Sequence, residues 1–301
     1  MKKSIISILL SITLTSVFAQ NENNVGIFPD VVYHQKDGIS LTMDIYVPEN
    51  QNNKGVIFIN SGGFQSPFFP NQYVENDALS KTDDSNYAFI PKIDLTPEFA
   101  KQFSFDALLN SGFTVFDVRH SSTPEYMLDE IITDLNLAVS YIKKHAKIYH
   151  VSKDKIGICG GSAGGYLAAF LAANPKNEND LKATVLYYPA GYDYLDERNI
   201  EVRKALPSLN ISEKKLDSLS LKHYLSNKMP PTLIMVGEND NPFITEPSDI
   251  ITNELKKSGV ICKKIIFENV GHIWMDENGK YSNETGDEAM DTLITWFNKY
   301  L

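Results

Sequence analysis

Short, continuously apolar runs recur along most of this sequence, and longer segments of mixed polarity separate them. Runs of this length and composition are typical of strands that are covered on both faces, and their alternation with helices indicates parallel pairing. The sequence therefore predicts an α/β fold with a mostly parallel central sheet and helices on both faces. The six runs are GVIFIN (55–60), TVFDV (114–118), KIGICGG (155–161), ATVLYYP (183–189), PTLIMVG (231–237) and KKIIFE (263–268).

Two strands around the turn KDG (36–38) are expected before the first of these runs. Apolar residues at helical spacing predict a helix around residues 131–142, and two more helices are expected over 162–173 and 287–301. Because nothing divides the core, we expect one domain over residues 20–301. It would carry two long insertions, at about 64–92 and 191–229, of the kind that form lids or binding loops.

The first residues have the pattern of a signal peptide, with Lys2 and Lys3 before an apolar run at 5–14. We expect cleavage after Ala19, which makes the protein secreted or periplasmic. The apolar run is short for a bilayer-spanning helix of roughly 20 residues, so stable membrane insertion is not expected.

Composition narrows the range of partners. The formal net charge is −10, and nucleic acid is not expected as a partner because phosphate binding needs a basic surface. The two cysteines, Cys159 and Cys262, lie in apolar strand-like runs, and we interpret them as free buried thiols. The sequence has no spacing typical of metal ligands and predicts neither metal nor cofactor. It leaves the oligomeric state open.

A serine surrounded by glycines joins one apolar run to a helix, in the order Gly160-Gly161-Ser162-Ala163-Gly164. A G-x-S-x-G pattern between a strand and a helix is typical of a nucleophile elbow, where a sharp turn exposes the serine hydroxyl. Phosphate-binding loops need a following lysine or a G-x-G-x-x-G pattern, and neither is present. We interpret Ser162 as a nucleophile.

A nucleophilic serine needs a base and an acid that orients the base, and both follow it in the chain in this type of fold. Of the six histidines, His272 lies late in the sequence, after an apolar run and before the final helix. Asp240 follows the run that ends at Gly237, and Glu238 is the alternative acid. We predict that Ser162, Asp240 and His272 meet at one edge of the sheet.

An oxyanion hole for such a serine requires two backbone N–H groups. Ala163, directly after the nucleophile, should supply one. Gly62 or Gly63, in the loop after the first apolar run, should supply the other.

Aromatic residues in both insertions are candidates for substrate contacts. From the first insertion these are Phe64, Phe68, Phe69, Tyr73 and Phe89, and from the second Tyr192 and Tyr194. Aromatic faces suit sugar rings or aryl acyl groups. Tyr187 and Tyr188 end an apolar run and are interpreted as core residues.

These motifs resemble those of the α/β-hydrolases, and more narrowly the branch of hormone-sensitive-lipase-like and carbohydrate esterases (acetyl xylan or feruloyl esterase-like). The resemblance extends from about Val31 to the C-terminus. In that branch the residues matching Ser162, Asp240 and His272 form the catalytic triad, and those matching Gly62, Gly63 and Ala163 form the oxyanion hole. The matching motifs are DGISLTMDIYVP (37–48), NSGGF (60–64) for HGGGW, VRHSSTPEY (118–126) for DYRLAPE, GGSAGG (160–165) for GDSAGG, PPTLIMVGENDNPF (230–243) and GHIW (271–274).

The chain departs from the motifs of that branch at Asn60, Ser61 and Gly161, which replace a histidine, a glycine and an aspartate. We therefore expect a differently shaped oxyanion loop and the loss of one polar contact beside the nucleophile. The resemblance implies structural roles for Arg119, His120 and Glu125.

The resulting hypothesis is a serine hydrolase that cleaves carboxylic esters through an acyl-enzyme, with a small-molecule or glycan ester as substrate. Two alternatives remain open. One is a serine peptidase of the prolyl-oligopeptidase type, which shares the fold and the triad. The other is a non-catalytic binding protein derived from such an enzyme.

Overall fold

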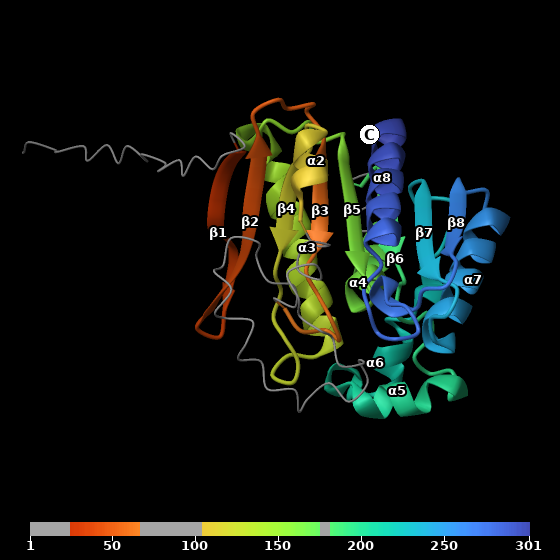
Figure 1. Cartoon of the computed structure of the whole chain (residues 1–301). Helices are drawn as coiled ribbons and strands as arrows, with labels where there is room; N and C mark the ends of the chain where they lie inside the picture. The colour runs from red at the N-terminus through yellow and green to blue at the C-terminus, as the bar shows by residue number, and fades with distance from the viewer. Residues whose placement is uncertain (1–24, 67–103, 175–180) are drawn as a thin grey trace, which may run out of the picture.

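The computed structural model describes residues 25–66, 104–174 and 181–301, so the predicted signal peptide and Phe68, Phe69, Tyr73 and Phe89 lie outside the described residues. An eight-stranded sheet runs through the molecule in the order β1-β2-β4-β3-β5-β6-β7-β8 (Figure 1). Its strands are β1 Val25–Lys36, β2 Ile39–Pro48, β3 Gly55–Ile59, β4 Thr114–Val118, β5 Ile156–Gly161, β6 Ala183–Tyr187, β7 Thr232–Gly237 and β8 Cys262–Phe267.

The pairing of the strands confirms the predicted sheet. β1 pairs with β2, and β2 with β4, in antiparallel orientation. All pairs from β4 through β3, β5, β6 and β7 to β8 are parallel. The carboxyl ends of these six strands therefore share one edge of the sheet, where loops of an α/β fold carry ligand sites.

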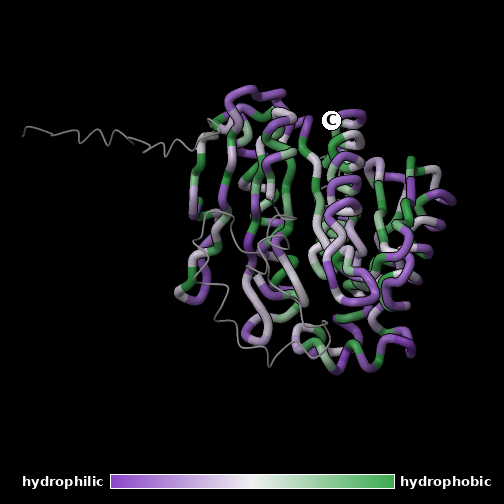
Figure 2. Tube along the Cα trace, in the orientation of Figure 1, coloured by the Kyte–Doolittle hydropathy of each residue, from purple (hydrophilic) through white to green (hydrophobic). Residues whose placement is uncertain are grey.

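Helices cover both faces of the sheet, as predicted (Figure 1). Residues of α3, α4 and α7 pack into one apolar cluster and those of α2 and α8 into another, one cluster on each face. Figure 2 shows hydrophobic residues concentrated on the central strands, with hydrophilic residues on the visible face of α8. The helices are α2 Asp106–Asn110, α3 Leu128–His145, α4 Ala163–Ala173, α5 Ile200–Ala205, α6 Glu213–Asp217, α7 Pro242–Lys257 and α8 Asn283–Tyr300.

The second insertion, residues 191–229, folds into the short helices α5 and α6 and several 3₁₀ turns. Figure 1 places α5 and α6 beyond the carboxyl ends of the strands, at the edge where the predicted site residues lie. The insertion therefore covers part of that edge.

Among the strands of the described residues, β8 forms the edge of the sheet and pairs only with β7. Its outer side is partly open, and Ile266 is 51% exposed. Cys262 in β8 and Cys159 in β5 are both free thiols, separated in the sheet by β6 and β7. Cys159 is buried, and Cys262 is half-buried. Burial raises the pKa of the Cys262 thiol to about 11.

Candidate active site

A tight turn places Ser162 between the end of β5 and the start of α4. Ser162 has φ 53° and ψ −120°, a conformation that costs a non-glycine residue about 1–3 kcal/mol. The surrounding backbone holds it there, since its N–H donates to the Tyr187 carbonyl at 3.0 Å and its carbonyl accepts from the Ala190 N–H at 3.0 Å. This is the conformation of the predicted elbow.

The elbow needs glycines because backbone atoms lie where side chains would begin. A Cβ on Gly160 would lie 2.5 Å from the Gly164 carbonyl oxygen, and one on Gly164 would lie 2.6 Å from the Ile59 carbonyl oxygen. Real Cβ atoms essentially never approach so closely, and a backbone atom cannot rotate aside. These two glycines allow β5, α4 and β3 to pack closely enough to form the turn.

Three predicted side chains meet beside the elbow. The His272 Nε2 atom lies 3.1 Å from Ser162 Oγ, and His272 Nδ1 lies 2.9 Å from Asp240 Oδ2. A carboxylate oxygen only accepts hydrogen bonds, so Nδ1 carries the proton and Nε2 presents its lone pair to the serine hydroxyl. The Asp240 side chain is 1% exposed and that of His272 is 22% exposed.

Loops after two neighbouring strands bring the acid and the imidazole to the serine. Asp240 follows β7, and its second oxygen accepts the Asn241 N–H at 2.8 Å. His272 follows β8 and begins a short 3₁₀ turn, His272–Trp274. Glu238, the alternative acid, instead accepts the N–H of Asn269.

Tyr188 supports the imidazole, a contact that the sequence did not predict. Its ring packs edge-on against His272, with 4.8 Å between ring centroids, and it also contacts the ring of Trp274. A Cβ on Gly161 would lie 2.9 Å from the Tyr188 ring, so this ring fills the space beside the missing side chain. The signal in the sequence was a glycine where related motifs have aspartate.

The loop after β3 forms a two-residue hairpin turn, which we call the oxyanion turn (Gly62–Gln65). Gly62 and Gln65 exchange both backbone hydrogen bonds, at 3.1 and 3.0 Å. The central residues, Gly63 and Phe64, have φ values of 56° and 66°, the signs of a type I′ turn. Left-handed backbone costs a residue such as Phe64 roughly 1–2 kcal/mol.

This turn corrects the prediction for Gly62, because its N–H is already donated to the Gln65 carbonyl. Among the hydrogen bonds of the described residues, none uses the N–H of Gly63 or Ala163. The N–H of the first helical residue has no acceptor within the helix. The N–H of a residue at the centre of a β-turn takes no part in the hydrogen bond that closes the turn. The candidate oxyanion donors are therefore Gly63 and Ala163.

Of the three candidate substrate contacts that lie in the described residues, Phe64, Tyr192 and Tyr194, two are wrong. Phe64 and Tyr194 are both fully buried, and their rings pack on each other and on Tyr166. Tyr194 also donates its hydroxyl to the Ala190 carbonyl at 2.8 Å. These aromatic side chains anchor the loops from inside instead of facing a ligand. Tyr192 is half-buried and lines a cavity between the second insertion and α7.

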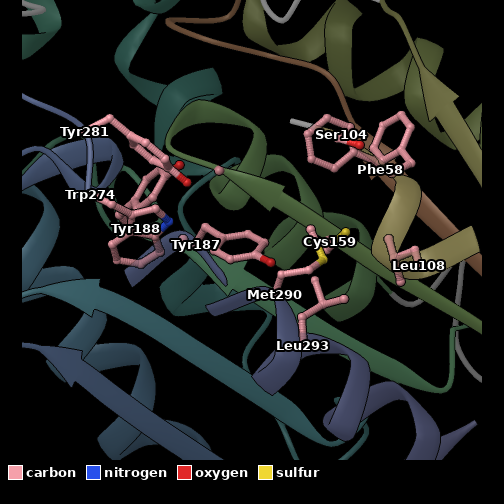
Figure 3. A pocket seen from close by; sticks show the side chains of 13 residues that line it. Phe58, Ser104, Leu108, Cys159, Tyr187, Tyr188, Trp274, Tyr281, Met290 and Leu293 are labelled. Atoms are coloured by element: carbon pink, nitrogen blue, oxygen red, sulfur yellow. The ribbon is translucent and has the colours of Figure 1, made fainter. Parts of the chain in front are cut away.

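A small cavity lies behind the elbow, on the face of the sheet covered by α2 and α8 (Figure 3). Tyr187, Tyr188 and Trp274 form one side of it, and Phe58 and Leu108 lie opposite. Tyr188 is buried as predicted, but Tyr187 is only half-buried, and both line this cavity. Its volume of about 50 Å³ has room for a few water molecules.

Buried charges lie next to the oxyanion turn. Arg119 donates to Asp44 at 2.8 and 3.1 Å and pairs with Asp30, which confirms its structural role. Asp117 lies between these groups and Asn60, whose amide approaches it at 3.5 Å. Burial, with repulsion from Asp44, raises the pKa of Asp117 to about 7.

His120 is also buried next to this turn, which agrees with the structural role expected for it. Its Nδ1 lies 2.6 Å from the Ser121 carbonyl, and burial lowers its pKa to about 4. Glu125 is exposed on the loop after β4.

No group of three potential metal-ligating side chains occurs in residues 25–66, 104–174 and 181–301. In the same residues, no helix combines the length and the apolar character that crossing a membrane requires.

Two comparisons with known sequences match parts of this chain. A family model described as BD-FAE matches residues 96–202, a stretch that includes the elbow. The chain is also 25% identical over 154 residues to LipM of Mycobacterium tuberculosis, named as a probable carboxylic ester hydrolase. That match covers 44% of this chain and 35% of the relative, so it spans about a third of the relative's length.

Solved structures of esterases match nearly the whole chain. Esterase 2 of Thermogutta terrifontis, solved phosphoramylated by tabun, has a TM-score of 0.65 at 19% identity, over 90% of this chain and 93% of its own. A hyperthermophilic esterase from the archaeon Pyrobaculum calidifontis has a TM-score of 0.65 at 20% identity, over 93% and 85%. The chain has the α/β-hydrolase fold.

Within this α/β-hydrolase fold, two of the three departures from the related motifs, Asn60 and Gly161, have a structural explanation. Asn60 stands where related motifs have histidine, and its amide approaches the buried Asp117. Gly161 stands where they have aspartate, and Tyr188 occupies the adjoining space. This chain therefore supports its elbow and its oxyanion turn with contacts of its own.

Proposed function

We propose that this protein hydrolyses carboxylic esters through a covalent acyl-enzyme, with Ser162 as nucleophile. The observation that carries the proposal is the continuous chain of hydrogen-bond distances from Ser162 Oγ through His272 to Asp240. Nucleophile, base and orienting acid at such distances have the arrangement of serine hydrolases. The names of the esterases that share the fold support the same reaction class.

In the acylation step, Ser162 Oγ attacks the acyl carbon while its proton passes to His272 Nε2. The buried carboxylate of Asp240 stabilises the imidazolium that forms. The N–H groups of Gly63 and Ala163 donate to the oxyanion of the tetrahedral intermediate. When the intermediate collapses, His272 returns the proton to the leaving alcohol, and the acyl group remains on Ser162.

In the second half of the reaction, His272 removes a proton from water as that water attacks the acyl carbon. The same two N–H groups stabilise the second tetrahedral intermediate. Its collapse releases the carboxylic acid and returns the proton to Ser162 Oγ. Each residue thus acts twice, and the enzyme returns to its starting state.

The finer proposal is that the ester lies on a carbohydrate. It rests on the sequence motifs that resemble carbohydrate esterases. The aromatic residues give it less support than expected, because two of those first assigned to the substrate, Phe64 and Tyr194, are core residues. A panel of acetyl, feruloyl and longer acyl esters, free and on oligosaccharides, will identify the substrate. Faster turnover of simple alkyl esters than of every glycan ester would contradict this part of the proposal.

We also propose that the protein is exported and that its signal peptide is cleaved after Ala19. Lys2 and Lys3, with the apolar run after them, support it. Mass spectrometry of the protein from its native host should give a chain that begins at Gln20. A mature chain that still begins at residue 1 would contradict export by this route.

The reaction is tested by Ser162→Ala, with p-nitrophenyl acetate as substrate and a fluorophosphonate as probe. We expect kcat to fall roughly 10⁶-fold and labelling to disappear. Equal activity in the variant would refute the assignment of the nucleophile. Preference for aminoacyl amides over esters would indicate the peptidase alternative, and an unreactive wild type would indicate a binding protein.

A further inference from the structure

Hydrogen bonds connect the oxyanion turn to the loop that follows β4, which we call the β4 loop (residues 119–127). The connection is made at Ser66, the residue directly after the turn. The Ser122 hydroxyl of the β4 loop accepts the Ser66 N–H at 2.8 Å and donates to the Ser66 carbonyl at 2.9 Å. One side chain therefore satisfies both backbone groups of Ser66, as a neighbouring strand would.

Two further contacts reinforce the same connection. The Ser66 hydroxyl accepts the His120 N–H at 3.2 Å, and the Phe64 carbonyl accepts the Thr123 N–H at 3.3 Å. None of these bonds uses the N–H of Gly63. They can fix the turn without occupying its donor.

The turn needs such external support because its own geometry is unfavourable. Phe64 is in the left-handed region, where an aromatic residue is rare, and its buried ring fixes only the apolar side. Loss of the polar anchor would allow the turn to relax and would move the Gly63 N–H. A displacement of about 1 Å in a catalytic group can reduce the reaction rate about 10²-fold.

We propose that Ser122 is a positioning residue for ester hydrolysis, because its hydroxyl holds the oxyanion turn with the Gly63 N–H directed at the developing oxyanion. The inference rests on the proposed function and adds to it a residue to which the sequence motifs assign no role. Ser122 does not touch the substrate; it acts through Ser66 and the turn.

The test is Ser122→Ala, with Ser122→Thr as the conservative variant and Ser140→Ala as the matched control. The control also removes a hydroxyl that donates to a carbonyl, at 2.9 Å, but on the exposed side of α3. For Ser122→Ala we expect kcat to fall roughly 10- to 100-fold, with KM within about twofold. Threonine should restore most of the rate, and the control should equal the wild type.

A second readout separates positioning from a merely structural role. A trifluoromethyl ketone that forms a tetrahedral adduct with Ser162 should lose affinity for Ser122→Ala by about the factor lost in kcat/KM. Inhibition by the product alcohol should change little, because the alcohol presents no acyl oxygen to the N–H donors of the turn. Should the alanine variant fail to fold, Ser122→Cys keeps the shape with a weaker hydrogen-bonding group, and we expect an intermediate loss.

The outcomes distinguish this inference from the proposed function. Unchanged kcat and adduct affinity in Ser122→Ala, with a reactive wild type, would overturn the role of Ser122 alone. Parallel losses of affinity for the adduct-forming ketone and for the product alcohol would also overturn it, since they would indicate general loosening of the site. A wild type that neither hydrolyses esters nor reacts with a fluorophosphonate would overturn the proposed function and this inference with it.

Discussion

The elbow and the oxyanion turn lie at the same edge of the sheet, and both contain a non-glycine residue with positive φ, Ser162 in one and Phe64 in the other. Their supports differ. Backbone atoms surround the elbow so closely that Gly160 and Gly164 cannot carry a Cβ. The turn is instead held by side chains, namely a buried ring below it and the Ser122 hydroxyl beside it.

This difference determines what each region tolerates. A loop fixed by close backbone contacts has no freedom to adjust, so one added methyl group is enough to disrupt it. A loop fixed by side chains can keep its backbone when one contact is replaced, although its geometry becomes less exact. The elbow should therefore fail completely when it fails, and the oxyanion turn should fail by degrees.

The largest effect is expected from glycine-to-alanine substitution in the elbow. Gly160→Ala places a Cβ 2.5 Å from a carbonyl oxygen, and we expect a loss of more than about 5 kcal/mol in unfolding free energy, or no folded protein. The matched substitution in the turn is Gly63→Ala, whose Cβ would meet only Leu206 at 3.9 Å. This substitution should lower the unfolding free energy by roughly 1–2 kcal/mol, because alanine is less favourable than glycine in the left-handed region. Denaturant titration measures both, and similar losses would contradict the distinction.

The buried ring of the turn should give the next largest effect. Phe64→Ala removes a fully buried aromatic ring and should cost about 3–5 kcal/mol. Phe64→Gly removes the same ring but also the strain of positive φ, so it should be about 1 kcal/mol more stable than the alanine variant. Chemical denaturation of the pair provides the measurement. An alanine variant more stable than the glycine variant would show that the strain is absent.

The buried carboxyl next to the turn should make stability depend on pH. The pKa of Asp117 is about 7 in the folded protein, against an ordinary value of 3.8, so the folded state holds its proton more tightly. The contribution to stability is therefore present below about pH 4 and is lost as pH rises towards 7. Asp117→Asn removes this dependence, so its unfolding free energy should rise relative to that of the wild type by roughly 4 kcal/mol between pH 4 and pH 8.

The comparison must be made between the two proteins and not on the wild type alone. His120 has a lowered pKa of about 4, so its contribution to stability is lost as pH falls from about 6.5 towards 4. This opposes the Asp117 effect in the same range but is common to both proteins. Thermal unfolding at several pH values gives the difference, and a difference that does not change with pH would contradict the expectation.

The smallest effect is expected from the aromatic contact between Tyr188 and His272, next to the elbow. Tyr188→Leu removes the ring that packs against His272, and we expect kcat to fall roughly two- to tenfold, the equivalent of one aromatic pair. Tyr188→Phe keeps the ring and should retain nearly full activity. A large loss in the phenylalanine variant would assign the hydroxyl a role that packing does not explain.

Much of the fold could be predicted because its signals are local. Each buried strand is a continuous apolar run, and the elbow is a pattern of glycines that backbone contacts require. α7 was not predicted, and its Pro242 and Pro247 belong to the residue type that is least favourable inside a helix. The Asn241 side chain nevertheless caps its first turn, and proline is favourable at the first position of a helix.

The candidate site was predictable only in part, for the same reason. Ser162, Asp240 and His272 each follow a strand, so the order of the strands brings them together. The role of Ser122 depends on which loop lies next to it, and the burial of Phe64 depends on rings from α4 and from the second insertion. Neither leaves a signal within its own stretch of sequence. The donor at Gly63 likewise depends on which partner the neighbouring N–H takes.

The proposed base depends on the least protected strand of the sheet. His272 follows β8, which has a partner on one side only, whereas Ser162 follows β5 at the centre of the sheet. Edge elements open locally at lower free energy than the core does. On heating, fraying of β8 would separate the imidazole from an intact serine, so enzymatic activity should disappear several degrees before the circular dichroism of the helices changes.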